Sequence, residues 1–199
     1  MAIEASVWLY WLACSGAGVL LRVNWRKIPN LLSSQLSSAK GQEGYTLALT
    51  LGWGATLVAA ITYILFTQKE SAGDYQLHDL VIFSLLNGSL EQLMFISWFL
   101  LGCWLGNQWG NQSPSRIFGL GFLSYALYSA AIHALFWVNV LPQHQPAPVM
   151  PIMFMLMSVT WMWLFWRYRA IFVIMSMHIV IDFLTVGHLH FSCQVPSVI

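Results

Sequence analysis

Long apolar runs alternate with short polar stretches along the whole chain. Each run holds roughly 20 residues, the length that an α-helix needs to cross the hydrocarbon core of a bilayer. The pattern predicts about six transmembrane helices and therefore an all-α, polytopic membrane helix bundle. The predicted helices cover about residues 5–21, 45–66, 80–105, 117–141, 149–166 and 172–190.

Composition supports the same class of protein. Hydrophobic residues make up 58% of the chain and charged residues only 8%, which lies outside the usual range of a soluble domain. The formal net charge of +1 gives no reason to expect a nucleic-acid partner. We therefore expect membrane lipids as the surroundings of this chain.

The basic residues predict an orientation. With six helices, the connections after the first, third and fifth lie on one side of the membrane, and they hold seven Lys or Arg side chains. The opposite side holds only Lys69. Because basic residues collect in cytoplasmic loops, both termini of this multi-pass chain are predicted to be non-cytoplasmic. The seven basic residues are Arg22, Arg26, Lys27, Lys40, Arg116, Arg167 and Arg169.

Four ionisable side chains lie inside the predicted helices rather than at their ends. Glu91, His133, His178 and Asp182 each fall roughly 12 to 18 Å from the outer end of their helix, at about 1.5 Å per residue. His178 and Asp182 have a spacing that puts both on one helical face. An ionisable group at this depth is costly and needs a partner or a task.

Polar and small residues form a stripe on three of the predicted helices, as expected for faces turned towards other helices. A shared internal cavity would satisfy all three faces together. The stripes consist of Ser84, Asn87, Gly88 and Glu91; of Tyr125, Ser129 and His133; and of His178, Asp182 and Thr185.

Two interpretations of the four ionisable residues remain open. They can form an interhelical hydrogen-bond network that only fixes the packing. Alternatively, Glu91 can act as general base on a water held by one histidine, while the second histidine and Asp182 polarise a carbonyl or hold a metal. His133 and His178 with one or two carboxylates would suit Zn²⁺, and they suit a metal-free glutamate mechanism equally well.

In their order and spacing these residues resemble the CAAX prenyl protease and bacteriocin-processing family, also called CPBP or Abi proteins. That family has three intramembrane motifs, EExxxR, FxxxH, and HxxxN or HxxxD. The segment from Glu91 resembles the first motif, His133 the second, and His178 with Asp182 the third. The resemblance implies a four-helix core at 80–191, preceded by a two-helix segment with a basic loop at 1–79 and followed by a tail at 192–199.

The chain departs from these motifs at three positions. Gln92 stands in place of the second glutamate, and Ile96 stands at the arginine position. Ser129 precedes His133 where the family has phenylalanine. Only the HxxxD motif is intact, so a divergent protease and a protein that has lost catalysis both remain open.

The resemblance implies a divergent intramembrane endopeptidase, a hydrolase of the CAAX-protease type that cleaves a peptide or membrane-protein substrate. In it Glu91 would activate water with His133 and His178, and Asp182 would stabilise the developing oxyanion. The alternative is a catalytically inactive membrane scaffold or assembly factor that keeps the same bundle and binds a membrane-protein partner. A third hypothesis is a proton or ion pathway through the same groups.

Overall fold

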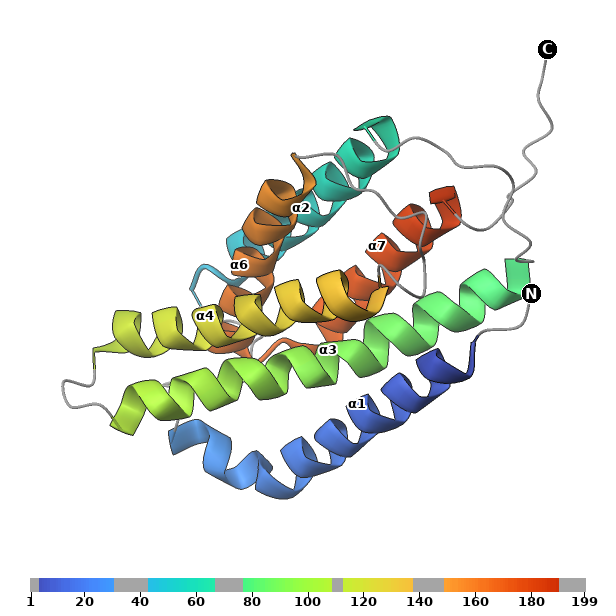
Figure 1. Ribbon diagram of the computed structural model, residues 1–199. Coiled ribbons are helices and arrows are strands. Elements are labelled where there is room, and N and C mark those ends of the chain that lie inside the picture. The colour runs from blue at the N-terminus through green and yellow to red at the C-terminus, as the bar shows by residue number, and fades with distance from the viewer. Residues whose placement is uncertain (1–3, 31–42, 67–76, 109–112, 138–148, 190–199) are drawn as a thin grey trace, which may run out of the picture.

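The computed structural model describes residues 4–30, 43–66, 77–108, 113–137 and 149–189. Within these ranges the chain is helical and contains no strand, so the predicted all-α bundle is confirmed (Figure 1). Its long helices are α1 (Ala5–Asn24), α2 (Tyr45–Phe66), α3 (Leu77–Gln108), α4 (Pro114–Ile132), α6 (Met150–Tyr168) and α7 (Ile171–Leu189). Two short elements, the 3₁₀ helix η1 (Trp25–Asn30) and the π-helical turn η2 (His133–Trp137), continue α1 and α4.

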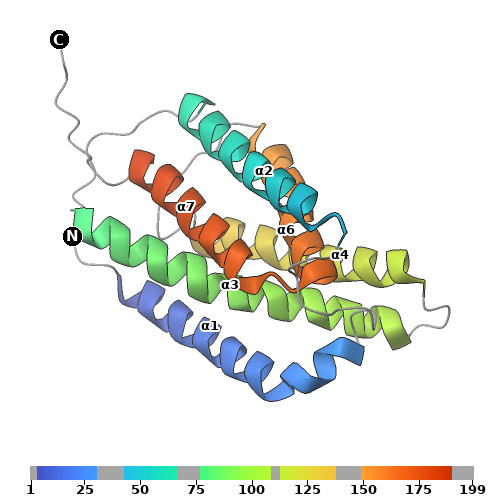
Figure 2. The same ribbon diagram turned by 180° about the vertical axis from the view of Figure 1, so that it is seen from behind.

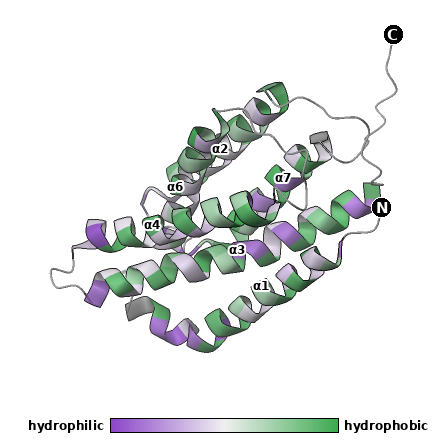
Figure 3. Cartoon of the chain, in the orientation of Figure 1, coloured by the Kyte–Doolittle hydropathy of each residue, from purple (hydrophilic) through white to green (hydrophobic). Residues whose placement is uncertain are grey.

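Hydrophobic length makes this an integral membrane protein. Four helical stretches among the described residues are long and apolar enough to cross a bilayer, and α7 contributes a shorter apolar stretch, Ile171–Gly187. Hydrophobic residues predominate along the helices, and hydrophilic residues are found at helix ends and in the middle of α3 (Figure 3). The four long stretches are Ala5–Ile28, Tyr45–Phe66, Leu77–Gln108 and Pro114–Trp137.

The predicted spans agree closely with these helices, and α2 has the predicted bounds. The helix α3 extends beyond its predicted span at both ends, because hydrophilic residues such as Asp79 and Gln108 complete its outer turns. Several predicted features fall outside the described residues: the end of the fourth span at 138–141, the basic residues Lys40 and Lys69, His190, and the tail 192–199.

The long helix α3 is the centre of the bundle. It packs against α1, α4 and α7, while α2 packs against α6 and α7 on the other side (Figures 1 and 2). The first two helices therefore share one bundle with the later ones. The proposed division of the chain at residue 79 stays a prediction about folding units.

Glycine allows the closest approaches of α3 to its neighbours. A Cβ atom on Gly88 would lie 2.5 Å from the backbone nitrogen of Ile179, so α3 and α7 are in backbone contact at this point. A Cβ on Gly102 would collide with the carbonyl oxygen of Leu120 on α4. Small residues at such crossings let membrane helices gain van der Waals contact, which drives their association in lipid.

Candidate functional site

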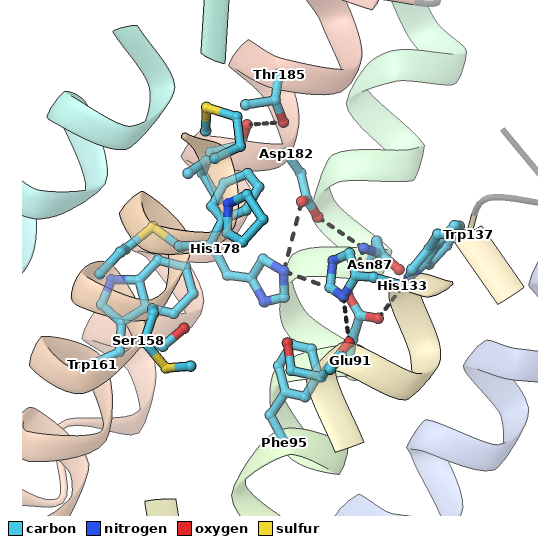
Figure 4. A pocket seen from close by; sticks show the side chains of 18 of the residues that line it. Asn87, Glu91, Phe95, His133, Trp137, Ser158, Trp161, His178, Asp182 and Thr185 are labelled. Atoms are coloured by element: carbon cyan, nitrogen blue, oxygen red, sulfur yellow. Dashed lines mark hydrogen bonds and ion pairs between the residues drawn. The ribbon is translucent and has the colours of Figure 1, made fainter. Parts of the chain in front are cut away.

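Three of the four predicted site residues meet between α3 and α7. Nε2 of His178 lies 3.5 Å from Oε2 of Glu91 and 3.6 Å from Oδ1 of Asp182. All three residues are buried, with 1% of Glu91 and 6% of His178 exposed. The three side chains point towards one another in the close view (Figure 4). The helical spacing of His178 and Asp182 accounts for one contact, and the backbone approach at Gly88 brings Glu91 to the same place.

Asn87 ties the two carboxylates together. Its amide nitrogen donates to Oε2 of Glu91 and to Oδ2 of Asp182, both at 3.0 Å. Its amide oxygen accepts a hydrogen bond of 3.0 Å from the indole N–H of Trp11 on α1. Asn87 therefore uses both of its N–H groups and its oxygen inside the bundle, and links three helices.

The second oxygen of Glu91 is held from a different direction. The Tyr10 hydroxyl donates to Oε1 at 2.7 Å, and the Trp137 indole N–H donates to the same atom at 2.9 Å. Tyr10 belongs to α1, and Trp137 ends the π-helical turn η2. Hydrogen bonds to a carboxylate in a low-dielectric environment are stronger than those between neutral groups, and they offset part of the cost of burying Glu91.

The His178 ring is fixed by its other nitrogen and by aromatic neighbours. Nδ1 lies 3.1 Å from Oε1 of Gln92, which can only accept, so Nδ1 carries a hydrogen. The rings of Phe95 and Trp161 have their centroids 5.7 Å and 5.4 Å from that of His178. Contact of Nε2 with two carboxylates then requires a proton on Nε2 or on a carboxylate. At 3.5 Å and 3.6 Å the two contacts of Nε2 are ion-pair contacts, which are attractive when such a proton is present.

His133 is the fourth predicted residue, and it occupies a different position. Its side chain is exposed, lines the same cavity as the other three, and has Nδ1 2.7 Å from the backbone oxygen of Ser129. Among the described residues it makes no hydrogen bond or ion pair with Glu91, His178 or Asp182. Its catalytic role stays a prediction.

A cavity of about 440 Å³ lies beside these residues. Its floor comes from α3 and α7, and its two side walls come from α4 with η2 and from α6. Ala130, His133 and Met155 line the cavity and are also exposed, so it opens at the surface between α4 and α6. The lining is mainly apolar away from the carboxylates, which suits a membrane-embedded ligand or substrate segment.

The donor set does not fit a resident metal ion. The described residues contain no group of three or more His, Cys, Asp or Glu side chains arranged to hold one. Both oxygens of Glu91 already accept hydrogen bonds from Tyr10, Trp137 and Asn87, and Nδ1 of His133 faces a backbone oxygen. Of the two possibilities that the sequence left open, Zn²⁺ and a metal-free glutamate mechanism, this donor set favours the second.

No family model, curated protein or solved structure matches this chain. The resemblance to the CPBP family therefore stays a prediction that depends on the three motifs alone. The chemistry of the site follows from its geometry, in which a carboxylate oxygen, an imidazole nitrogen and a second carboxylate oxygen converge beside a cavity.

Sequence patterns missed two side chains that complete this geometry. Tyr10 and Trp137 are aromatic residues in apolar runs, where packing or interfacial anchoring is the ordinary explanation. The signal that could have found them is their chemistry, because a buried tyrosine hydroxyl or indole N–H needs an acceptor. Asn87 lies on the predicted polar stripe, but its hydrogen bond to Asp182 depends on how α3 and α7 pack.

Proposed function

We propose that this protein is an intramembrane endopeptidase that hydrolyses a peptide bond with a water activated by Glu91. The observation that carries the proposal is that the carboxylates of Glu91 and Asp182 both lie within 3.6 Å of Nε2 of His178, beside a cavity that opens between two helices. A substrate segment in the lipid phase can enter such an opening sideways. The resemblance to the CPBP motifs supports the same reaction.

The reaction follows from the three converging atoms. A water molecule held between Oε2 of Glu91 and the substrate transfers one proton to Glu91 while its oxygen bonds to the carbonyl carbon. The carbonyl oxygen becomes negative, and an N–H of His178 or the O–H of a protonated Asp182 donates a hydrogen bond to it. Glu91 then passes its proton to the amide nitrogen, the C–N bond breaks, and an amine and a carboxylic acid result.

The multi-pass orientation belongs to the same proposal. Arg22, Arg26 and Lys27 follow or end α1, Arg116 begins α4, and Arg167 ends α6. These basic residues favour the cytoplasmic side at that end of the bundle and non-cytoplasmic termini at the other. Cysteine labelling at Ser6 and at Asn24 in intact cells, with a membrane-impermeant maleimide, tests this orientation; equal labelling at both would overturn it.

The test of the function is the substitution Glu91→Gln, which keeps shape but removes the base. We expect a fall in cleavage of at least about 100-fold, the usual scale for loss of general-base catalysis. New peptide N-termini are measured in membranes from cells that contain the wild-type protein or the variant. The matched control is Glu4→Gln, the same change at an exposed position. Cleavage products that persist with Glu91→Gln in a folded, inserted protein contradict the proposal.

One observation favours the alternative, a catalytically silent scaffold. Three protein donors contact Glu91, as they would a carboxylate that only fixes packing. A scaffold would tolerate Glu91→Gln and depend on its exposed aromatic surface instead. Changing the exposed Trp104 and Trp163 to leucine would then release a membrane-protein partner that copurifies with the wild-type chain.

A further inference from the structure

The two oxygens of Glu91 have different surroundings. Oε1 accepts from Tyr10 at 2.7 Å and from Trp137 at 2.9 Å, so both of its lone pairs are used. Oε2 accepts from Asn87 at 3.0 Å and lies 3.5 Å from Nε2 of His178. Only Oε2 has a lone pair left for a proton. The carboxylate thus has one oxygen, Oε1, with both lone pairs held by protein donors, and one oxygen, Oε2, with a single protein donor, next to His178.

The Tyr10 hydroxyl is itself oriented by a second tyrosine. It lies 3.0 Å from the hydroxyl of Tyr128, and it has only one hydrogen, which it gives to Glu91. The Tyr128 hydroxyl must therefore donate to Tyr10. The Tyr128 ring stacks on Trp98 at 5.2 Å, with 12° between the planes, which holds this donor in place. The donor chain runs in one direction, from Tyr128 through Tyr10 to Oε1.

Aromatic packing keeps the Tyr10 ring in position without its hydroxyl. Its centroid lies 5.0 Å from that of Phe136 and 5.7 Å from that of Trp137. The ring of Trp137 also packs against Phe83 of α3 at 5.7 Å. Removing the hydroxyl therefore leaves the contact between α1 and η2 in place, and separates the effect of the hydrogen bond from the effect of packing.

We propose that Tyr10 of α1 and Trp137 of η2 are positioning residues that hold Oε1 of Glu91, so that Oε2 alone faces the chemistry. This inference rests on the proposed function for its catalytic meaning. Through Tyr10, the first helix becomes part of the site. Without Tyr10 and Trp137, Asn87 alone would hold the Glu91 carboxylate, which could then rotate and present either oxygen to the substrate. Orientation of a base within a fraction of an ångström governs its efficiency.

We call Tyr10 and Trp137, the two donors to Oε1 of Glu91, the clamp. A hydrophobic carbodiimide, dicyclohexylcarbodiimide, tests the clamp without any substrate. It reacts with carboxyl groups in apolar surroundings, and peptide mass spectrometry reports modification of Glu91 and Asp182 separately. We expect Tyr10→Phe to raise the rate at Glu91 about 10-fold, the scale of one lost hydrogen bond to a charged group, and to leave Asp182 unchanged. Tyr168→Phe is the control, because it removes a hydroxyl that donates to the Glu43 backbone oxygen, away from the cavity.

An unchanged rate at Glu91 in folded Tyr10→Phe protein overturns the inference. A rise of equal size at Glu91 and Asp182 also overturns it, because that pattern reports a loosened bundle. Should Tyr10→Phe fail to fold, Trp137→Phe removes the other donor to the same oxygen, and the same selective rise is expected.

Cleavage then separates this inference from the proposed function. With a cleaved peptide in hand, Tyr10→Phe should lower kcat about 10- to 100-fold and change KM less than about twofold, since the substrate does not touch Oε1. A selective rise in labelling together with no cleavage by the wild-type protein would overturn the proposed function and leave the clamp standing. Cleavage by the wild-type protein, together with unchanged labelling of Glu91 in Tyr10→Phe, would overturn the clamp and leave the proposed function standing.

Discussion

The contact between α3 and α7 differs in kind from the contact between α4 and α6. At Gly88 the backbone of α3 meets the backbone of α7. The preceding residue, Asn87, donates a hydrogen bond to Asp182 of α7. The helices α4 and α6 touch through large rings at Phe118 and Trp166 and through one hydrogen bond of 2.7 Å between Tyr125 and Ser158. Beyond that bond the cavity separates them.

This difference assigns separate tasks to the two sides of the cavity. The side made by α3 and α7 holds the ionisable groups at fixed distances, as a reaction centre requires. The side made by α4 and α6 offers the opening through which a membrane segment can reach those groups. Changes at the first side should therefore cost stability and function together, whereas changes at the second should mainly alter access.

The largest effect is expected from Asn87→Leu. The substitution removes three hydrogen bonds at once and leaves the Trp11 N–H and two buried carboxylates each without one partner. We expect a loss of about 4 kcal/mol in the free energy of unfolding, at about 1 to 3 kcal/mol for each unsatisfied group. Unfolding in mixed detergent measures it. Asn24→Leu, at an exposed position, is the control and should change little.

The next largest effect is expected from Gly88→Ala. The added Cβ would lie 2.5 Å from the Ile179 nitrogen, so the two backbones must separate. We expect destabilisation of about 2 to 3 kcal/mol from this overpacking, measured by the same unfolding experiment. Gly54→Ala is the matched control because a Cβ there has nothing within 4 Å. Equal stability of the two variants would contradict the backbone contact.

A smaller effect is expected from Tyr125→Phe. It removes the hydrogen bond to Ser158 and should cost about 1 kcal/mol, the net value of an ordinary hydrogen bond. Ser158→Ala should cost about the same, and the double variant should cost less than the sum because both changes remove one interaction. Additive losses in this double-mutant cycle would mean that the bond does not hold α4 against α6.

The smallest effect on stability is expected from Ala126→Leu. Ala126 lines the cavity, so the longer side chain has room and should change the free energy of unfolding by less than about 0.5 kcal/mol. It should nevertheless slow carbodiimide modification of Glu91, because it narrows the path from the surface. Unchanged modification would place the entry route elsewhere than between α4 and α6.

Much of this architecture could be predicted from the sequence. Hydrophobic length predicted the membrane helices, because a bilayer permits few other structures. Equal depth and helical spacing predicted that four ionisable residues would face one cavity. All four line it, and three of them are in contact, while His133 stands apart; the four are Glu91, His133, His178 and Asp182. Hydrophobic length, depth along a helix and helical spacing depend only on the order of residues within one segment, so they can be read from the sequence.

Contacts between distant side chains could not be predicted in this way. Tyr10 and Glu91 are separated by 81 positions in the sequence. Aromatic residues lie on several faces of α1, and their pattern does not indicate which face packs against α3. His133 shows the same limit. It lines the cavity together with Ser129 of its predicted stripe, but its ring nitrogen lies against the backbone oxygen of Ser129 and not against Glu91. Rotation of a helix about its axis depends on packing with its neighbours.

The π-helical turn η2 has a consequence for how α4 tolerates change. A π turn contains an extra residue relative to an α turn, and therefore rotates everything after it. Trp137 reaches Glu91 from the end of this turn. Deleting one residue there would shorten α4 by only about 1.5 Å, leaving it able to cross the bilayer, but it would turn the indole away from the carboxylate. At His133–Trp137, insertions and deletions are therefore restricted mainly by the direction in which the Trp137 indole must point. The helix length needed to cross the bilayer restricts them much less.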